Sequence, residues 1–151
     1  MKTVITQSRP KILLSAFILS AIIFSSCRII LVSEYDNKIA EQIEKVSKSI
    51  DVFYLTMQET ATTAEENRAY GKFAGQYIAI EVELQLLLNK NKARTKNEET
   101  VKICENLISM FEKYKNEHKR ANTISDADIK LNLEYLRGVL YPLLVSEIMK
   151  K

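Results

Sequence analysis

Few side chains in this sequence have a type and spacing that could support catalysis or metal binding. The single histidine, His118, directly follows Glu117, so the Glu-x-x-His pairs that hold metals in helical bundles are absent. His118 is predicted to be solvated, because bases surround it at an expected helix end. Glu81 and Glu83 lie two residues apart and therefore face different sides of a helix. Cys104 has no neighbour in sequence that would stabilise a thiolate. We expect no catalytic residue, no metal and no cofactor.

The other cysteine, Cys27, ends a pattern that has its own chemistry. Residues 1–11 carry three bases and no acid, residues 12–24 form an uncharged and mostly apolar run, and two serines follow. This order is typical of a secretory signal peptide. A membrane-spanning helix needs about twenty apolar residues, a length that the run reaches only by counting through residues 28–32. An uncleaved membrane anchor is the alternative.

The four residues from Phe24 to Cys27, FSSC, resemble the lipobox of bacterial lipoproteins, with Phe24 in place of the usual Leu. The resemblance implies that residues 1–26 are removed, that Cys27 is lipidated and that its new amine is acylated. Each buried methylene contributes about 0.8 kcal/mol, so two or three acyl chains hold a protein firmly on a bilayer. In that family Asp after the cysteine favours the inner membrane. Because Arg28 stands there instead, we expect a cell-envelope protein anchored in the outer membrane and facing the periplasm.

The composition favours one neutral helical domain after the signal peptide. Residues 27–151 keep 19 of the 22 basic residues, which equals the 19 acidic ones. A neutral domain outside the cytoplasm is a poor candidate for nucleic-acid binding. If Cys27 is lipidated, Cys104 is left alone and no disulfide framework forms. Only three glycines and two prolines interrupt the whole chain, which favours long helices.

Four stretches repeat apolar residues at steps of three and four, the spacing of amphipathic helices. They follow capping-box-like starts at Ser33, Thr63, Thr95 and Ser125. After a tether of residues 27–33, residues 34–151 are predicted to form an all-α domain, an antiparallel up-down four-helix bundle with a kinked last helix. A three-helix packing with the fourth helix bent aside is the alternative. The predicted inward positions are Ile39, Ile43, Val46, Ile50, Phe53 and Met57; Tyr70, Phe73, Tyr77, Ile80, Leu84 and Leu87; Val101, Cys104, Leu107 or Ile108, Phe111 and Tyr114; and Ile129, Leu133, Leu136, Leu140, Leu143 and Ile148.

Three local features depart from these patterns. Pro142 predicts a kink near residues 138–141, or an early end of the helix with a short continuation. Gly71 and Gly75 lie four residues apart, and we expect them to allow close helix packing, with a ligand groove as the alternative. Residues 89–97 break the periodicity and are expected to form a loop.

Antiparallel topology would bring the 89–97 loop and the C-terminus to the end where the first helix begins. Bases near an anionic surface contribute about 1 kcal/mol each, enough to orient a lipid-anchored bundle. The alternative is an ordinary polar loop and terminus. The predicted membrane-proximal basic cluster consists of Arg28, Lys90, Lys92, Arg94, Lys96, Lys150 and Lys151.

The segment from Val32 to Asp36, VSEYD, directly after the lipobox and before long amphipathic helices, is similar to a group of small bacterial lipoproteins. This resemblance supplies no catalytic residue, only Cys27 as the lipidated position. We expect a non-enzymatic, membrane-anchored envelope lipoprotein that acts as a protein-binding or structural module, with the membrane and another protein as partners. A protective lipoprotein, an immunity or exclusion factor that neutralises a toxin or phage component, is the alternative. An enzyme or small-ligand carrier would require polar groups in the bundle core.

Overall fold

The computed structural model describes residues 32–60 and 65–151. In this part of the chain four long helices follow one another: α2 (Asn37–Glu59), α3 (Tyr70–Lys92), α4 (Glu98–Ala121) and α5 (Asp126–Ile148). A short 3-10 helix, η1 (Glu65–Arg68), precedes α3. The predicted signal peptide, Cys27 and Arg28 lie outside the described residues. Within the described residues, no helix is both long and apolar enough to cross a bilayer.

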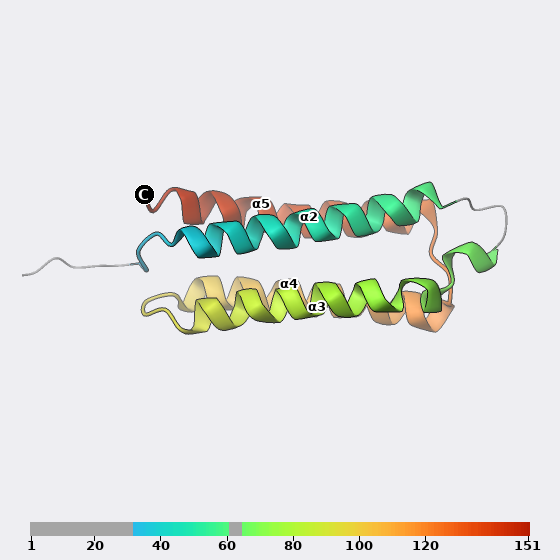
Figure 1. Ribbon diagram of the computed structural model, residues 1–151, viewed down its shortest axis with the longest axis horizontal. Coiled ribbons are helices and arrows are strands. Elements are labelled where there is room, and N and C mark those ends of the chain that lie inside the picture. The colour runs from blue at the N-terminus through green and yellow to red at the C-terminus, as the bar shows by residue number, and fades with distance from the viewer. Residues whose placement is uncertain (1–31, 61–64) are drawn as a thin grey trace, which may run out of the picture. The chain divides into compact units, whose positions relative to one another are not determined.

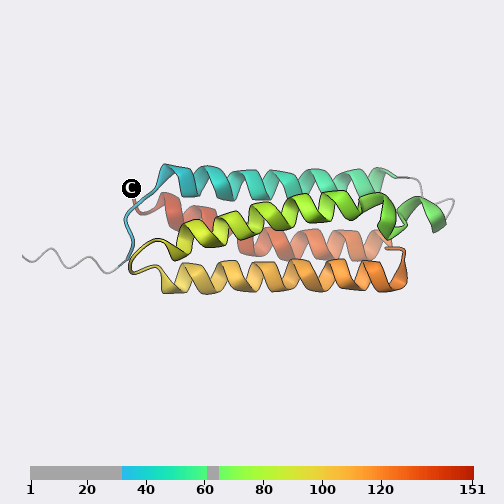
Figure 2. The ribbon, with the colours of Figure 1, turned by 60° about the horizontal axis from the view of Figure 1, so that its bottom comes forward.

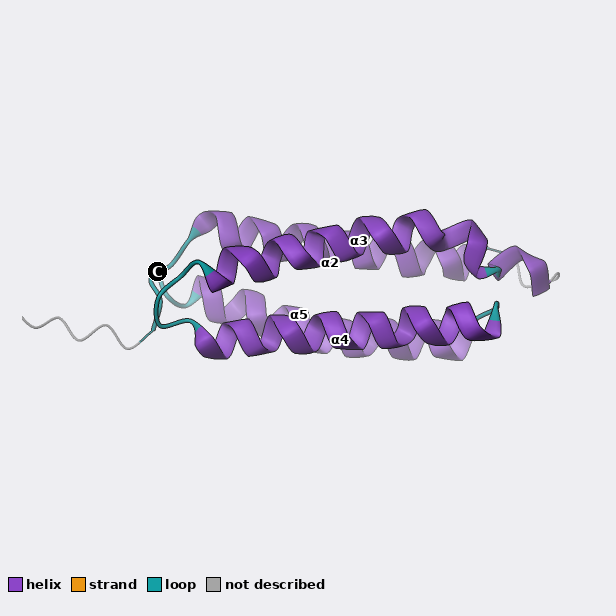
Figure 3. Cartoon of the chain, turned by 90° about the horizontal axis from the view of Figure 1, so that it is seen from below, coloured by secondary structure: helices purple, strands orange, loops and turns teal. Residues whose placement is uncertain are grey.

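The four helices form an antiparallel up-down bundle, which confirms the predicted fold class (Figure 1, Figure 2). Helices α2 and α4 each pack against both α3 and α5, so every helix has two neighbours. The start of α2, the α3–α4 loop and the C-terminus lie at one end, which we call the proximal end (Figure 3). The α2–α3 and α4–α5 links lie at the other end, the distal end. The alternative with the fourth helix bent aside is therefore wrong.

The centre of the bundle is filled by the side chains that the helical spacing predicts to point inward. All of the predicted inward positions are buried except Tyr70, Val101 and Ile148. Tyr70 and Val101 are partly buried and pack against the core from its edge. Leu107 and Ile108, between which the spacing did not choose, are both buried. The period of three and four residues thus identified the core almost completely.

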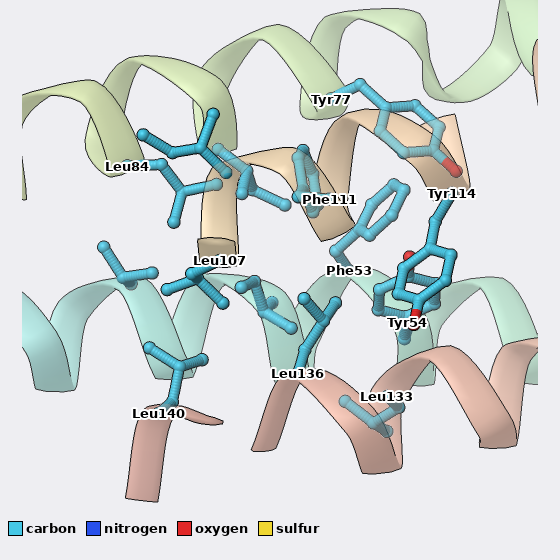
Figure 4. Packing of buried hydrophobic residues seen from close by; sticks show 14 of the residues in the cluster. Phe53, Tyr54, Tyr77, Leu84, Leu107, Phe111, Tyr114, Leu133, Leu136 and Leu140 are labelled. Atoms are coloured by element: carbon cyan, nitrogen blue, oxygen red, sulfur yellow. The ribbon is translucent and has the colours of Figure 1, made fainter. Parts of the chain in front are cut away.

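The aromatic side chains of the core gather in its distal half, together with aliphatic ones. Phe53 on α2 lies edge-on to Tyr77 on α3, with ring centroids 4.7 Å apart. Such contacts add about 0.5–1.5 kcal/mol beyond the burial of area. Leu84 and Leu107 form part of the neighbouring aliphatic layer (Figure 4).

The first helix begins later than its predicted capping box. Asp36 is the N-cap of α2, and its side chain accepts a hydrogen bond from the N–H of Lys38 at 2.8 Å. Ser33, the predicted cap, is buried, and its hydroxyl donates to Asn97 Oδ1 at 2.8 Å. Because this hydroxyl is engaged with the α3–α4 loop, Ser33 belongs to the bundle and caps no helix.

The other helix starts give a mixed outcome. Helix α4 begins after Asn97, so the predicted start at Thr95 is wrong. Helix α3 begins at Tyr70, and Thr63 lies outside the described residues. The prediction for α5 is confirmed, because the Ser125 hydroxyl accepts from the N–H of Asp128 at 3.1 Å.

Helix α3 continues to Lys92, so the predicted 89–97 loop shortens to residues 93–97. Leu87, Leu88 and Asn91 are buried and extend the inward face by another turn. The Asn91 amide donates to the Leu87 carbonyl at 2.9 Å, and its oxygen accepts from Asn97 at 2.9 Å. The polar composition hid this turn because an asparagine takes a position that the apolar pattern would give to a hydrophobic residue.

Helix α5 runs without interruption through Pro142 to Ile148, so it does not end early. Its ribbon bends toward the C-terminal end (Figure 2), as expected for a proline that removes a helical hydrogen bond. Ile148 is 43% exposed, contrary to the prediction, while Glu147 is 1% exposed and takes the inward position.

Gly71 and Gly75 do not mediate close packing within the bundle, so that prediction is wrong. Both are exposed, and a Cβ atom added at either would meet no atom of the described chain within 4 Å. A glycine inside a helix costs up to about 1 kcal/mol relative to alanine. No contact in the described part of the bundle offsets this destabilisation.

Leu136→Ala should lower the free energy of unfolding by about 2–5 kcal/mol, because it removes a fully buried side chain and leaves a cavity. Chemical denaturation followed by circular dichroism measures the change. Leu131→Ala on the same helix is the matched control: Leu131 is 45% exposed, so its loss should stay within about 0.5 kcal/mol. Equal losses would contradict the assigned inward face of α5.

Candidate functional site

The proximal end is built around a buried carboxylate, that of Glu147. Arg94 donates to its two oxygens at 2.9 and 3.1 Å, and Lys150 donates to one of them at 2.6 Å. The backbone N–H of Asp36 adds a bond of 2.9 Å. Two cations and a backbone donor stabilise the ionised carboxylate in a site that water hardly reaches. We call Arg94, Glu147 and Lys150 the Glu147 clamp.

The clamp joins segments that are far apart in sequence. Arg94, in the α3–α4 loop, also donates to the carbonyl of Glu34. Lys150 donates to the Ser33 hydroxyl at 3.1 Å, and the Ser33 N–H donates to the carbonyl of Lys96 at 3.1 Å. Residues 33–36 are therefore fastened both to the α3–α4 loop and to the C-terminal end of the chain.

The ionisation of Glu147 depends on opposing effects. Burial raises the pKa of its carboxyl, but the hydrogen bonds from Arg94, Lys150 and the Asp36 N–H outweigh burial and hold the pKa below its ordinary value. A carboxyl whose pKa is depressed by folding contributes stability above its ordinary pKa, and that contribution is lost as pH falls through the folded pKa. The clamp is therefore ionised at neutral pH and weakened by acid.

The predicted basic cluster gathers at the proximal end, but several of its members bind other side chains of the bundle. Arg94 and Lys150 belong to the clamp, and each side chain is only 12% exposed. Lys90 donates to the side chain of Gln42 at 3.1 Å. Lys90 and Lys92 lie in the last turn of α3 and not in a loop.

Three further members of the cluster are placed as follows. Lys92 pairs with Glu105 at 2.9 Å, with both side chains half exposed. The Lys151 ammonium lies 4.7 Å from the ring centre of Tyr35. Lys96 adopts a positive φ of 56° in the α3–α4 loop. Arg28 lies outside the described residues. The proximity of the cluster to a membrane stays a prediction.

The distal end is closed by a second buried cation, Arg68, which follows from no pattern in the sequence. Its side chain is 4% exposed and pairs with Asp126 at 2.6 Å. Its guanidinium donates to the carbonyls of Gln58, Thr60 and Ile124 at 2.9, 3.2 and 3.4 Å. A single side chain therefore ties the end of α2 to the α4–α5 link.

His118 is buried, with 2% of its surface exposed, so the prediction of a solvated histidine is wrong. Its Nε2 lies 2.7 Å from the Arg68 carbonyl, which can only accept, so Nε2 carries the hydrogen. Nδ1 then accepts from the Tyr77 hydroxyl at 3.0 Å. Its position four residues after buried Tyr114 continues the inward spacing of α4, a signal that the sequence did carry.

The buried environment keeps His118 neutral. Burial lowers the pKa of the imidazole and outweighs the raising effect of the hydrogen bond to the Arg68 carbonyl. A neutral ring that donates on one side and accepts on the other acts here as a structural link between η1, α3 and α4.

A polar pocket of about 350 Å³ opens beside His118. Glu117, Arg120, Asp128 and Asn132 are among its lining residues, so it presents charges of both signs. Across the described part of the chain, no group of three His, Cys, Asp or Glu side chains is arranged to hold a metal ion. Both ring nitrogens of His118 are engaged, by the Arg68 carbonyl and by the Tyr77 hydroxyl.

The remaining chemically suggestive residues have structural roles. Burial raises the pKa of the Cys104 thiol to about 11, so very little thiolate forms at neutral pH. Glu81 pairs with Lys115 on α4 at 2.7 Å, whereas Glu83 pairs with Lys45 on α2 at 2.9 Å. The two carboxylates point to different neighbours, as predicted.

An apolar ridge lies on the outward side of α3. Ile78, Val82 and Leu86 follow one another at steps of four residues and are 56, 59 and 41% exposed. A groove of about 320 Å³ between α2 and α3 includes exposed Val52, and another of about 370 Å³ runs beside the ridge. We call Ile78, Val82 and Leu86 the outer ridge. The sequence carried this signal too, as a second apolar row beside the inward row of the same helix.

Comparison of the chain with protein-family models, with curated proteins and with solved structures gave no match.

Arg94→Gln should lower the free energy of unfolding by about 3 kcal/mol at neutral pH, because it leaves the buried Glu147 carboxylate with a single cation. Lys92→Gln is the matched control. Its ion pair with Glu105 is half exposed and should contribute no more than about 0.5 kcal/mol. Urea denaturation measures both, and an equal effect of the two changes would contradict the role given to the clamp.

The only histidine of the chain gives a pH prediction. The pKa of His118 is lower in the folded state than in the unfolded state, so the unfolded chain takes up the proton first. The neutral His118 side chain contributes fully to stability above the ordinary pKa of histidine. This contribution is lost as the pH falls from that value through the pKa of His118 in the folded state. The melting temperature of the parent protein should therefore decrease when the pH is lowered from about 7.5 to about 5.5. His118→Gln should melt lower at the upper pH but change little across this window. If the melting temperatures of the parent and of His118→Gln changed in parallel with pH, the buried and neutral state of His118 would be contradicted.

Proposed function

We propose that this chain is a lipid-anchored lipoprotein of the cell envelope whose helical bundle is a non-enzymatic protein-binding module. The outer ridge is the observation that supports the binding role. Large exposed apolar side chains that form a continuous row are typical of interaction surfaces. The charged residues near this row, Glu81 and Glu83, are paired with lysines on the flanking helices.

The anchor is proposed to be Cys27, followed by Arg28, which favours the outer membrane with the bundle facing the periplasm. Cys27 precedes Ser33 by six residues, a span of at most roughly 20 Å when extended. The Glu147 clamp holds residues 33–36 in place, so a lipid at Cys27 would restrain the bundle through its proximal end.

The interior of the bundle supports a binding module more than a carrier of small ligands. Aliphatic and aromatic side chains fill the described core. Two of its buried polar side chains bond to other protein groups: Gln42 donates to Glu83 at 2.8 Å, and Asn97 donates to Asn91 at 2.9 Å. In the described chain the Tyr54 hydroxyl is buried without a hydrogen-bond partner, and it is a single group. No row of unsatisfied polar groups follows the axis of the described bundle, as a ligand channel would require.

Cys27→Ala should abolish lipidation and release the chain from the membrane fraction. Metabolic labelling with a palmitate analogue, followed by fractionation, should detect the parent protein and not this variant. Cys104→Ala is the matched control, because the Cys104 thiol is buried on α4, and its label should equal that of the parent. Equal labelling of the parent and Cys27→Ala would overturn the lipoprotein proposal.

A further inference from the structure

The outer ridge continues into a strip that lacks large side chains. Gly71, Gly75 and Ala79 are themselves four residues apart and form an adjoining row, with Gly75 three residues before Ile78, on the exposed side of α3 nearer its distal end. At both glycines the space is open, because an added Cβ would meet no atom of the described chain within 4 Å. We call these three residues the glycine strip. One face of α3 therefore carries a raised half and a hollow half of equal length.

When a second copy of α3 lies antiparallel to the first, the raised half of each helix faces the hollow half of the other. A two-fold axis between Ile78 and Ala79 places Ile78 of one copy opposite Ala79 of the other. The same axis places Val82 opposite Gly75, and Leu86 opposite Gly71. Each large side chain then faces a small residue, and every contact is made twice, as a two-fold interface requires.

We propose that the occupant of this face is a second copy of the chain, docked antiparallel, with the outer ridge of each α3 filling the glycine strip of the other. This inference rests on the proposed protein-binding function and names its partner. It also gives the two glycines a role, because the close approach of a second backbone requires positions without side chains.

The electrostatics of the face permit such self-association. Between Lys72 and Lys90 the only charged residues of α3 are Glu81 and Glu83. Glu81 is bound to Lys115 and Glu83 to Lys45, so two copies bring no uncompensated like charges of this segment together. The neutral side chains of Gln76 and Gln85, which line the adjoining grooves, border the apolar contact.

The size of the face indicates a weak dimer. A single pair of helices over this length buries less than the roughly 1,200 Å² at which stable complexes begin. A lipid anchor would raise the effective concentration of the copies by confining them to a surface. The two proximal ends lie at opposite ends of the antiparallel pair, so on one membrane the two bundles would lie along its surface.

Disulfide trapping of the full chain tests both the partner and its orientation. Ile78→Cys places the thiol beside the two-fold axis, so this variant should couple to itself on mild oxidation. Leu86→Cys should not, because two copies of residue 86 lie roughly 22 Å apart along the helix axes, beyond the reach of a disulfide. A mixture of Leu86→Cys and Gly71→Cys chains should couple to each other. Leu131→Cys, at an exposed site on α5, gives the background from random collisions.

The proposal expects roughly tenfold more dimer from Ile78→Cys than from Leu131→Cys. Adding Gly75→Leu, which fills the strip in open space, should remove most of that excess. Self-coupling of Leu86→Cys as strong as that of Ile78→Cys would overturn the antiparallel arrangement. Coupling at background level throughout would overturn the second copy as occupant and favour a different protein or the bilayer. Labelling of Cys27 is read separately, so failure of the anchor and failure of the dimer are distinguishable.

Discussion

The burial of one carboxylate governs the proximal end of this bundle. A charge as inaccessible as that of Glu147 is stable only when cations and N–H donors surround it. Here the donors come from the α3–α4 loop, from the C-terminal residues and from the chain just before α2. These three segments must be in place together, so the ionised carboxylate couples the start of the domain to its end.

The distal end is also built around a buried charge, here a cation. The guanidinium of Arg68 is satisfied by backbone carbonyls and Asp126, and the neutral His118 links the backbone of η1 to Tyr77. Between the two ends the core consists mainly of packed aliphatic and aromatic side chains. Arg68, His118 and Glu147 are thereby engaged in holding the two ends of the bundle closed.

Helix α3 differs from its neighbours because it is apolar on two sides. Its inward row belongs to the core, while the outer ridge is exposed and the two glycines of the strip face open space. A helix with exposed glycines is less stable than one with alanines, and exposed branched side chains gain nothing in water. Both features become favourable when another helix covers them.

The sequence by itself determined the helical elements, the inward rows and the antiparallel order, because a period of three and four residues with short links permits few other folds. Its pattern also predicts that Cys27 is lipidated. Which polar residues are buried was decided by the tertiary structure. Arg94 and Glu147 are 53 residues apart, and His118 lies 50 residues from the carbonyl it binds. A lysine or arginine in a polar stretch looks the same whether it faces water or a buried partner, and only its spacing from Tyr114 distinguished His118. Only the folded chain brings that partner within hydrogen-bonding distance, and only the folded chain shows that the space around Gly71 and Gly75 is open.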